Sequence, residues 1–503
     1  MNRASGAAPA SCAIRNALIL DPDSAQPLAR DILVVDGRIE AVGDRDMAVP
    51  QEVPDLDASD RIVIPGLINA HTHSAGNLAR SWTEHWTLEL HLNGGRALRG
   101  APSLEDQYTS ALLGAAEMVS RGCTACYDLV YEFPAPSVDG MKAVGQAYAD
   151  IGIRAVVAPM FSDLSFYQAV PGLLEAMPAD LRKQLERTPA AGLDPIEVLE
   201  QLDRVWPFNR ELVTLGLAPT IPMHCTDAYL TRLAAFARDH GFNFHTHVAE
   251  SKVQAIAGQQ RYGRSIIAHL EALGILRSNF TAAHCVWIDD DDMKRLAGSG
   301  GVVAHCPGCN MRLGSGLAAV RRMLDHGVTV GVGTDSRLAS DNLNMFEAMR
   351  LASFVSRVQK GDHSEWLTTR ESFDLATTGG ARALNLGVKL GRIDIGYAAD
   401  LTFIDAGNLN YVPLNNLMNQ IVHAEDATAV TGTMIAGGLA YWDRRFTTID
   451  MPQLRRRAEA AADRLRATSQ EALAFAARLE PLVSSFCGGL ARGDRSSFCG
   501  AGR

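Results

Sequence analysis

The chain has 503 residues, a formal net charge of -10 and 47% hydrophobic residues. This acidic balance argues against nucleic acid as a partner, because a phosphate backbone rewards clustered cations. No apolar run is long enough to cross a bilayer, and the N-terminus lacks the apolar core of a secretory signal, so we expect a cytoplasmic protein without a membrane partner. A small molecule is therefore the expected partner.

The first elements in chain order are short β-like segments. They occupy residues 14–63, where Asp36 and Gly37 mark a hairpin turn. The same short β pattern returns after the middle of the chain, over residues 389–445. We expect residues 10–64 and 389–445 to pair as one small, discontinuous β-sandwich domain formed by both chain ends.

The middle of the chain, residues 65–388, alternates apolar strands with amphipathic helices, several of which end at a glycine. Eight strands are predicted, at 62–73, 123–130, 154–161, 212–220, 242–250, 280–288, 301–307 and 328–335. Repeated βα units of this kind close into a barrel. The predicted fold class is therefore α/β, a (β/α)8 TIM-like barrel with the small β domain beside it.

The last segment, residues 446–503, is predicted to be a helical and flexible tail. Its start is rich in Ala, Arg and Glu, and the pentapeptide Ser-Ser-Phe-Cys-Gly then occurs twice, at 484–488 and 496–500. A short, glycine-rich repeat buries little apolar surface. We expect it to be unstructured or a loosely docked strap.

Ligand-type side chains gather at the predicted carboxyl ends of the barrel strands. His71 and His73 are two residues apart on the first strand, so both side chains point to the same face. The later strands end in His247 with Glu250, His284, His305 and Asp335. Because the active site of a barrel lies at this face, the pattern predicts a metal centre there.

The motifs that carry these residues resemble the amidohydrolase superfamily, in its metal-dependent deaminase and chlorohydrolase group, which includes cytosine, guanine and S-adenosylhomocysteine deaminases and triazine hydrolases. They read "PGLINAHTH", "HTHVAES", "AHCVW", "HCPGCNMRLGSG" and "GVGTDS". The resemblance implies one divalent metal ion, Zn²⁺ or Fe²⁺, with the ligands His71, His73, His247 and Asp335. No lysine occurs in residues 212–220, where two-metal relatives carry a bridging lysine, so a single ion is expected.

The resemblance also assigns catalytic roles. It implies that Glu250 is a proton shuttle and that His284 orients or polarises the attacking water. A bound cation lowers the pKa of water from 15.7 to about 7, and Asp335 could take the proton from that water while Glu250 protonates the substrate. His245, which precedes the ligand His247 by two residues, is interpreted as a structural neighbour.

Substrate-binding residues are expected around this centre. The resemblance places His305 and Asn310 near the substrate. Trp82, Glu84 and Trp86, in the loop after His73, could stack on and hydrogen-bond a flat heterocycle, or the tryptophans could pack the loop onto the barrel. A sixth candidate is Thr220, which stands where relatives that deaminate adenosine-like thioethers carry a histidine, and this argues against a nucleoside.

The expected reaction is hydrolytic deamination of an amino-substituted N-heterocycle. Dechlorination or dealkylamination of a triazine-like ring and amide or ring-opening hydrolysis are the alternatives, because pocket shape and not the metal selects the leaving group. A degenerate barrel that serves only as a binding scaffold is a further alternative, but it would not need both Glu250 and His284. The resemblance also implies a homo-oligomer.

Overall fold

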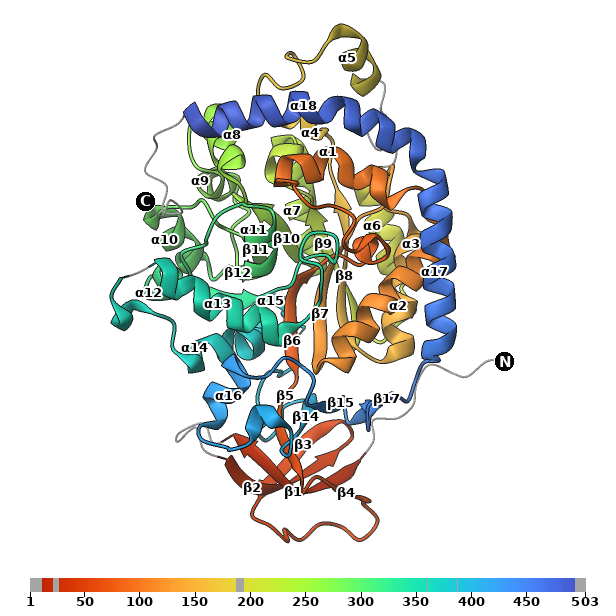
Figure 1. Ribbon diagram of the computed structural model, residues 1–503, viewed down its shortest axis with the longest axis vertical. Coiled ribbons are helices and arrows are strands. Elements are labelled where there is room, and N and C mark those ends of the chain that lie inside the picture. The colour runs from red at the N-terminus through yellow and green to blue at the C-terminus, as the bar shows by residue number, and fades with distance from the viewer. Residues whose placement is uncertain (1–10, 21–26, 187–193, 360, 387, 494–503) are drawn as a thin grey trace.

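The computed structural model describes residues 11–20, 27–186, 194–359, 361–386 and 388–493. It contains a parallel eight-stranded barrel and a separate nine-stranded sheet built from both ends of the chain. The barrel occupies the centre of the molecule and the second sheet lies at one end of it (Figure 1). The predicted fold class is confirmed.

The barrel strands follow one another in chain order around the barrel. They are β6 (Leu67–Thr72), β7 (Cys123–Val130), β8 (Arg154–Phe161), β9 (Val213–Pro219), β10 (Asn243–Val248), β11 (Phe280–His284), β12 (Val302–His305) and β13 (Thr329–Val332). Every residue of β6, β7 and β8 is buried, as expected for parallel strands covered on both faces. Next to the last strand, the Asp335 amide donates to the His71 carbonyl at 2.9 Å and joins the two ends of the barrel.

The first predicted barrel strand, residues 62–73, is in fact two strands that belong to different sheets. β5 (Arg61–Pro65) pairs with the small sheet, and β6 begins the barrel directly after Gly66. A Cβ on Gly66 would lie 2.2 Å from the Thr124 hydroxyl, so only glycine fits where the chain changes sheet. A continuous apolar run does not reveal such a break.

The small domain is one hydrogen-bonded sheet, where the sequence predicts a β-sandwich. Its other strands are β1 (Cys12–Leu20), β2 (Pro27–Val35), β3 (Arg38–Gly43), β4 (Asp55–Asp57), β14 (Leu401–Asp405), β15 (Val430–Ile435), β16 (Gly438–Trp442) and β17 (Arg445–Phe446). Pairing of β5 with β14 joins the two chain ends. The sheet has its own apolar core, which includes Ile14, Ile32 and Phe403.

Helices surround the barrel. They include α1 (Leu88–Arg99), α2 (Leu104–Ser120), α3 (Val138–Ile151), α4 (Phe166–Ala169), α5 (Ala179–Glu186), α6 (Pro195–Val205), α7 (Asp227–His240), α8 (Lys252–Tyr262), α9 (Ile266–Ala272), α10 (Asp290–Ser299), α11 (Pro307–Arg312), α12 (Val320–Asp325), α13 (Met345–Gln359), α14 (Thr369–Asp374), α15 (Gly380–Leu384) and α16 (Leu417–His423). The short helices η1 (Ser74–Ala79) and η2 (Pro222–His224) follow β6 and β9. Local signals fix their ends: Ser103 and Asp106 form a capping box on α2, and Gly241 ends α7 in a left-handed conformation.

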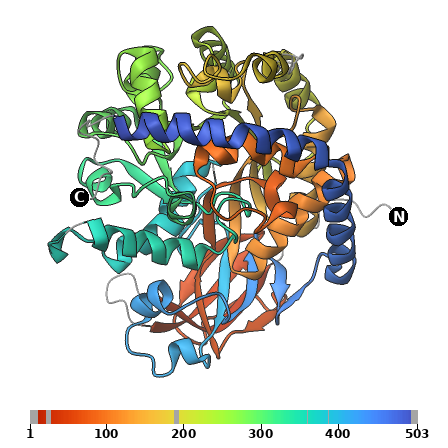
Figure 2. The ribbon, with the colours of Figure 1, turned by 45° about the horizontal axis from the view of Figure 1, so that its top comes forward.

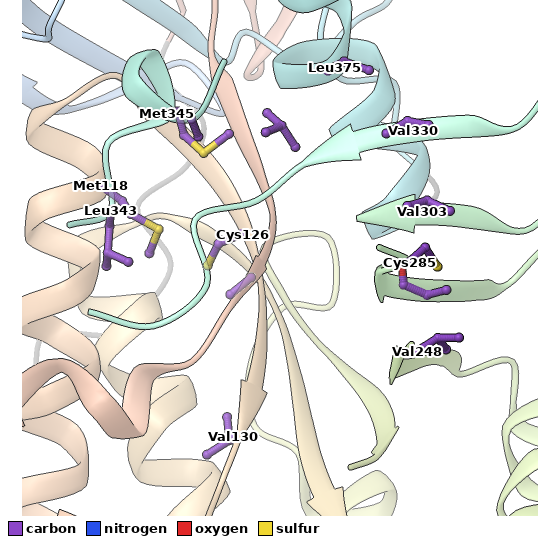
Figure 3. Packing of buried hydrophobic residues seen from close by; sticks show 14 of the residues in the cluster. Met118, Cys126, Val130, Val248, Cys285, Val303, Val330, Leu343, Met345 and Leu375 are labelled. Carbon is purple, nitrogen blue, oxygen red and sulfur yellow. Dashed lines mark hydrogen bonds between the residues drawn. The ribbon is translucent and has the colours of Figure 1, made fainter. Parts of the chain in front are cut away.

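The main core lies between the barrel strands and these helices. Figure 3 shows strand residues such as Val248, Cys285, Val303 and Val330 in a row along neighbouring strands. All four are buried. This packing holds the strand ends, and with them the predicted ligands, at fixed positions.

Two helices follow the small domain, α17 (Met451–Thr468) and α18 (Gln470–Gly493). α17 runs along the outside of the barrel and α18 crosses it beside α1, at the end away from the small domain (Figures 1 and 2). The first copy of the repeated pentapeptide lies in a packed helix, where the sequence predicts an unstructured segment or a loosely docked strap. Cys487 of this copy is buried in the core, and so is Val483 just before it. The second copy lies outside the described residues.

No helix in the described ranges combines the length and the apolar character needed to cross a membrane.

Candidate active site

Two histidines with fixed tautomers face each other at the barrel mouth. His73 follows β6, and its Nδ1 lies 2.7 Å from the Leu129 carbonyl oxygen. His247 is on β10, and its Nδ1 lies 2.5 Å from the Thr220 carbonyl oxygen. A carbonyl only accepts, so both Nδ1 atoms donate and both Nε2 atoms are left with a lone pair.

These two Nε2 atoms lie 3.2 Å apart. Neither carries a proton to share, so their lone pairs repel each other unless a cation lies between them. Two nitrogens bound to one tetrahedral zinc ion at about 2.0–2.1 Å are separated by roughly 3.3 Å. The geometry of His73 and His247 therefore fits a shared metal ion.

The other two predicted ligands join the same group. His71 is fully buried, and neither of its ring nitrogens has a hydrogen-bond partner in the described part of the chain. It forms a potential metal-binding group with His73 and His247, in which the ligand atoms lie within 4.8 Å of one another. Asp335 Oδ1 lies 3.4 Å from His73 Nε2. Three neutral imidazoles and a carboxylate are a donor set that suits a divalent transition metal.

The carboxyl group of Asp335 is ionised in this setting. Burial raises its pKa, but the positive charge that His73 and His284 carry when protonated outweighs burial and lowers the pKa to about 2, and a divalent cation on the same ligands would act in the same direction. Its backbone has a φ of 59°, in the left-handed region that an aspartate seldom adopts. The strained conformation turns the side chain into the site, as is common at functional positions.

The pKa of Glu250 is shifted in the opposite direction to that of Asp335. Glu250 lies just after β10 and is 2% exposed. Burial, followed by the nearby charges of Asp335 and Glu89, raises its pKa well above the ordinary range. The pKa of Glu250 is thus raised and that of Asp335 is lowered, and two carboxyl groups whose pKa values are shifted apart in this way are candidates for an acid and a base.

His284 lies between these two carboxyl groups. It ends β11, and its Nδ1 donates to Asn310 Oδ1 at 2.9 Å. Its Nε2 lies 3.5 Å from Glu250 Oε2 and 3.9 Å from Asp335 Oδ2. Burial lowers its pKa, so the ring is neutral and Nε2 is an acceptor directed at the space between the two acids.

Two further histidines lie close by but not in this arrangement. His245 packs edge-on against the Tyr127 ring, with centroids 4.5 Å apart, inside the barrel as expected for a structural neighbour. His305 is buried at the end of β12, and burial lowers its pKa to about 3. It is not among the residues that line the cavity, and its role in substrate binding stays a prediction.

A cavity of about 830 Å³ opens over the site. Its wall includes His73, His247, Glu250 and Asp335, together with Thr220. Thr220 is the one predicted substrate-binding residue that reaches the cavity, although its hydroxyl donates to the Phe161 carbonyl oxygen at 3.0 Å. Asn310 lies below the cavity, where it holds His284.

The loop residues predicted to contact the substrate do not line the cavity either. Trp82 lies at the surface near Arg466, and the Glu84 side chain is 86% exposed. Trp86 packs onto Gly94 in α1, where a Cβ would lie 2.3 Å from the indole ring. The alternative in which the tryptophans pack the loop onto the barrel fits this placement, because α1 lies between the loop and the cavity.

Sequence reasoning missed most of the cavity wall. His91, Arg96 and Arg99 contribute from α1, and Phe475 and Leu479 from α18. The sequence does contain a signal for the α1 part of the wall: Arg96 and Arg99 are three residues apart, so they lie on the same face of a helix. No local signal marks α18, because it contacts residues far away in the sequence.

Comparison with known proteins gives a consistent result. The model of the Amidohydrolase family matches residues 62–440. A 5-methylthioadenosine/S-adenosylhomocysteine deaminase of Desulforudis audaxviator is 31% identical over 90% of this chain and 98% of its own length. A 5'-deoxyadenosine deaminase of Methanosarcina mazei is 29% identical over the same shares of the two chains.

Two solved structures share the fold. An adenosine deaminase from Xanthomonas campestris with bound zinc superposes with a TM-score of 0.78 at 25% identity, over 92% of this chain and 99% of its own. Atrazine chlorohydrolase TrzN from Arthrobacter aurescens, complexed with zinc, gives a TM-score of 0.79 at 24% identity, over 90% and 100%. With the family model covering most of its length, this chain belongs to the amidohydrolase family.

Proposed function

We propose that this protein is a metal-dependent hydrolase that removes the amino group of an N-heterocycle and releases ammonia. The observation that carries the proposal is the arrangement of Glu250, His284 and Asp335, in which one carboxyl group with a raised pKa and one with a lowered pKa flank the same imidazole nitrogen. The deaminases among the relatives support the choice of reaction.

The metal ion in this proposal is zinc or Fe²⁺, held by His71, His73, His247 and Asp335. The bound zinc of the Xanthomonas adenosine deaminase supports zinc as the first choice. When bound, the ion supplies Lewis acidity that makes water acidic enough to react at neutral pH.

The chain's own residues move the protons. Asp335 accepts the proton of the attacking water, while His284 Nε2 accepts a hydrogen bond from that water and orients it. Glu250 donates its proton to the ring nitrogen beside the carbon under attack. Collapse of the tetrahedral carbon then needs a proton on the departing amine, which passes from Asp335. As the carbonyl forms, the remaining hydroxyl proton returns to Glu250 and restores the acid. Water and the amino-heterocycle thus become a carbonyl compound and ammonia.

The cavity supports a flat aromatic substrate. Phe133, Phe161 and Tyr131 lie in its wall, and such rings stack on heterocycles. Its volume, about 830 Å³, is in the upper part of the usual range for ligand pockets and leaves room for a substituent on the ring. Nucleosides therefore belong in the test panel beside free bases, despite Thr220.

A substrate screen tests the reaction. Aminated purines, nucleosides, pyrimidines, pterins and triazines are assayed for ammonia release, with chloride release from chlorotriazines measured in parallel. We expect ammonia from at least one heterocycle and a loss of about 10²–10⁴-fold in kcat in Glu250→Gln, because the acid is removed while its shape is kept. Chloride release alone, or equal ligand binding without turnover in both forms, would contradict the proposal.

Metal analysis tests the ligand set. We expect about one equivalent of zinc or iron per chain, and its loss in His71→Ala and Asp335→Asn but not in Glu250→Gln, which serves as the matched control. Dialysis against a chelator should abolish activity, and added Zn²⁺ should restore it. Full activity of a metal-free protein would rule the site out.

The homo-oligomer and the cytoplasmic location stay predictions. Light scattering of the purified chain tests the first, and cell fractionation tests the second.

A further inference from the structure

Two arginines of α1 line the active-site cavity without an acidic partner. Arg96 and Arg99 both face the cavity, and neither forms an ion pair with an Asp or Glu of the described residues. Arg96 is exposed and Arg99 is half-buried. The Nε of Arg99 is buried and has no hydrogen-bond partner among the described residues. A partly buried charge without an acidic partner is costly, so the position of Arg99 is typical of a binding site.

The neighbours of these arginines are aromatic. The guanidinium of Arg99 lies over the Tyr131 ring, 4.3 Å from its centroid, and Arg96 lies over the ring of Phe133. Burial lowers the pKa of Arg96, and the charge of Arg99 lowers it as well, although Tyr131 raises it. Burial and Arg99 also lower the pKa of His91 to about 4. The cluster is therefore a region of uncompensated positive charge.

The acidic residue next to Tyr131 does not neutralise the cluster. Glu132 accepts hydrogen bonds from the Ser137 amide at 2.7 Å and from Gln107 Nε2 at 3.1 Å, which turns it toward the start of α3. The nearest link to the catalytic centre is His91, whose ring is within electrostatic reach of both Arg99 and Asp335. The arginines and the proposed metal site thus share one cavity, with His91 between them.

We propose that Arg96 and Arg99 bind an anionic group, a carboxylate or a phosphate, on the substituent of the heterocyclic substrate. The inference rests on the proposed function for the reacting end of the substrate. Guanidinium groups bind both anions through paired N–H donors, and stacking on Tyr131 and Phe133 fixes the planes of the two forks. The substituent runs along α1 while the ring lies over the metal ligands.

Matched substrate pairs test the proposal. We compare pterin with pterin-6-carboxylate, 5-methylthioadenosine with S-adenosylhomocysteine, and adenosine with its 5'-monophosphate, so that the carboxylate and phosphate sources are separated. For the pair that is turned over, Arg99→Met should lower kcat/KM for the anionic member by about 10- to 100-fold and change the neutral member by less than about 3-fold. Arg99→Lys should restore part of the difference.

An exposed arginine provides the control. Arg238 pairs with Asp239 on the surface, 2.9 Å away, and Arg238→Met should leave both members of each pair unchanged. An equal loss for the anionic and the neutral substrate in Arg99→Met would mean that Arg99 only holds the wall together, and this would overturn the proposal.

A binding experiment keeps the two proposals distinguishable. If no member of the panel is turned over, calorimetry with inorganic phosphate and with succinate still reports on the arginines. We expect one of these anions to bind to the wild-type protein and to His71→Ala, and to be lost in the double variant Arg96→Met/Arg99→Met. Binding that survives the double variant, that is lost in His71→Ala, or that is absent for both anions would contradict the anion site.

Discussion

Single hydrogen bonds to ring nitrogens decide which atom of each histidine faces the site. The carbonyls of Leu129 and Thr220 hold the protons of His73 and His247 on Nδ1, and the Asn310 side chain does the same for His284. Each ring then presents Nε2 to the centre as an acceptor. The Leu129 and Thr220 partners are backbone carbonyls, which no substitution removes. The partner of His284 is the side chain of Asn310, which can be replaced.

Replacement of Asn310 therefore tests the orientation of His284 alone. We expect Asn310→Ala to lower kcat by about 10- to 100-fold, because the ring loses the partner that fixes its tautomer and direction. The metal content and KM should remain near the wild-type values, and Asn310→Asp, which keeps an acceptor oxygen, should recover most of kcat. An unchanged kcat in Asn310→Ala would show that His284 needs no such support.

At this scale the sequence allows the reacting centre to be predicted better than the cavity wall. Strand-end positions are set by the alternation of apolar segments, so His71, His247 and Asp335 could be placed at one face from spacing alone. For Trp82 and Trp86 the sequence left open whether they contact the substrate or pack the loop onto the barrel, because the path of a loop depends on what packs beneath it, here α1. Arg99 was missed for the same reason.

Between elements, one buried ion pair connects the barrel with the small sheet. Arg154 begins β8, and Asp400 immediately precedes β14. Nε and Nη2 of the arginine donate to the two carboxylate oxygens at 2.8 and 3.2 Å, and the Ala436 amide donates to the same carboxylate at 2.8 Å. Both side chains are almost fully buried, so each charge depends on the other.

Removal of one partner should therefore destabilise the whole protein. We expect Asp400→Ala to lower the free energy of unfolding by about 3–5 kcal/mol, because the Arg154 charge remains buried without its partner. Glu459→Ala is the matched control: it breaks an exposed pair with Arg455 on α17, which water screens, so the free energy of unfolding should hardly change. Urea unfolding of the three proteins measures the difference, and a similar small loss in both variants would contradict this role of Asp400.

The elements themselves were predictable where their signals are local. Seven barrel strands were expected within a few residues of their ends, and the capped helices α2 and α7 follow from Ser103 and Gly241. The break at Gly66 was not, because the glycine is required by Thr124 on a strand that is distant in sequence. The single sheet of the small domain likewise depends on the pairing of β5 with β14, some 340 residues apart, as Ile62 pairs with Ile404.

In the whole molecule, the small sheet formed by both chain ends lies away from the cavity, whereas the last helix lines it. The first and last strands form the small sheet at the end of the barrel away from α18, and α18 returns to the cavity and packs beside α1 (Figures 1 and 2). Asn93 on α1 donates to the Ala476 carbonyl at 3.1 Å and ties the two helices together. A segment more than 370 residues away in sequence from α1 thus completes the wall that faces the metal ligands.

The aromatic residues of α18 allow this arrangement to be tested. Phe475 lines the cavity, whereas Phe486 lies about three turns further along the helix, against Gly172 and outside the cavity wall. We expect Phe475→Ala to raise KM for the best heterocyclic substrate by about 3- to 10-fold, because a stacking surface of about 0.5–1.5 kcal/mol is lost, with little change in metal content. Phe486→Ala removes the same side chain from the same helix and should leave KM near the wild-type value, with circular dichroism to confirm that both variants are folded. An equal rise in KM in both variants would mean that α18 acts through the general stability of the barrel mouth and that Phe475 does not contact the substrate.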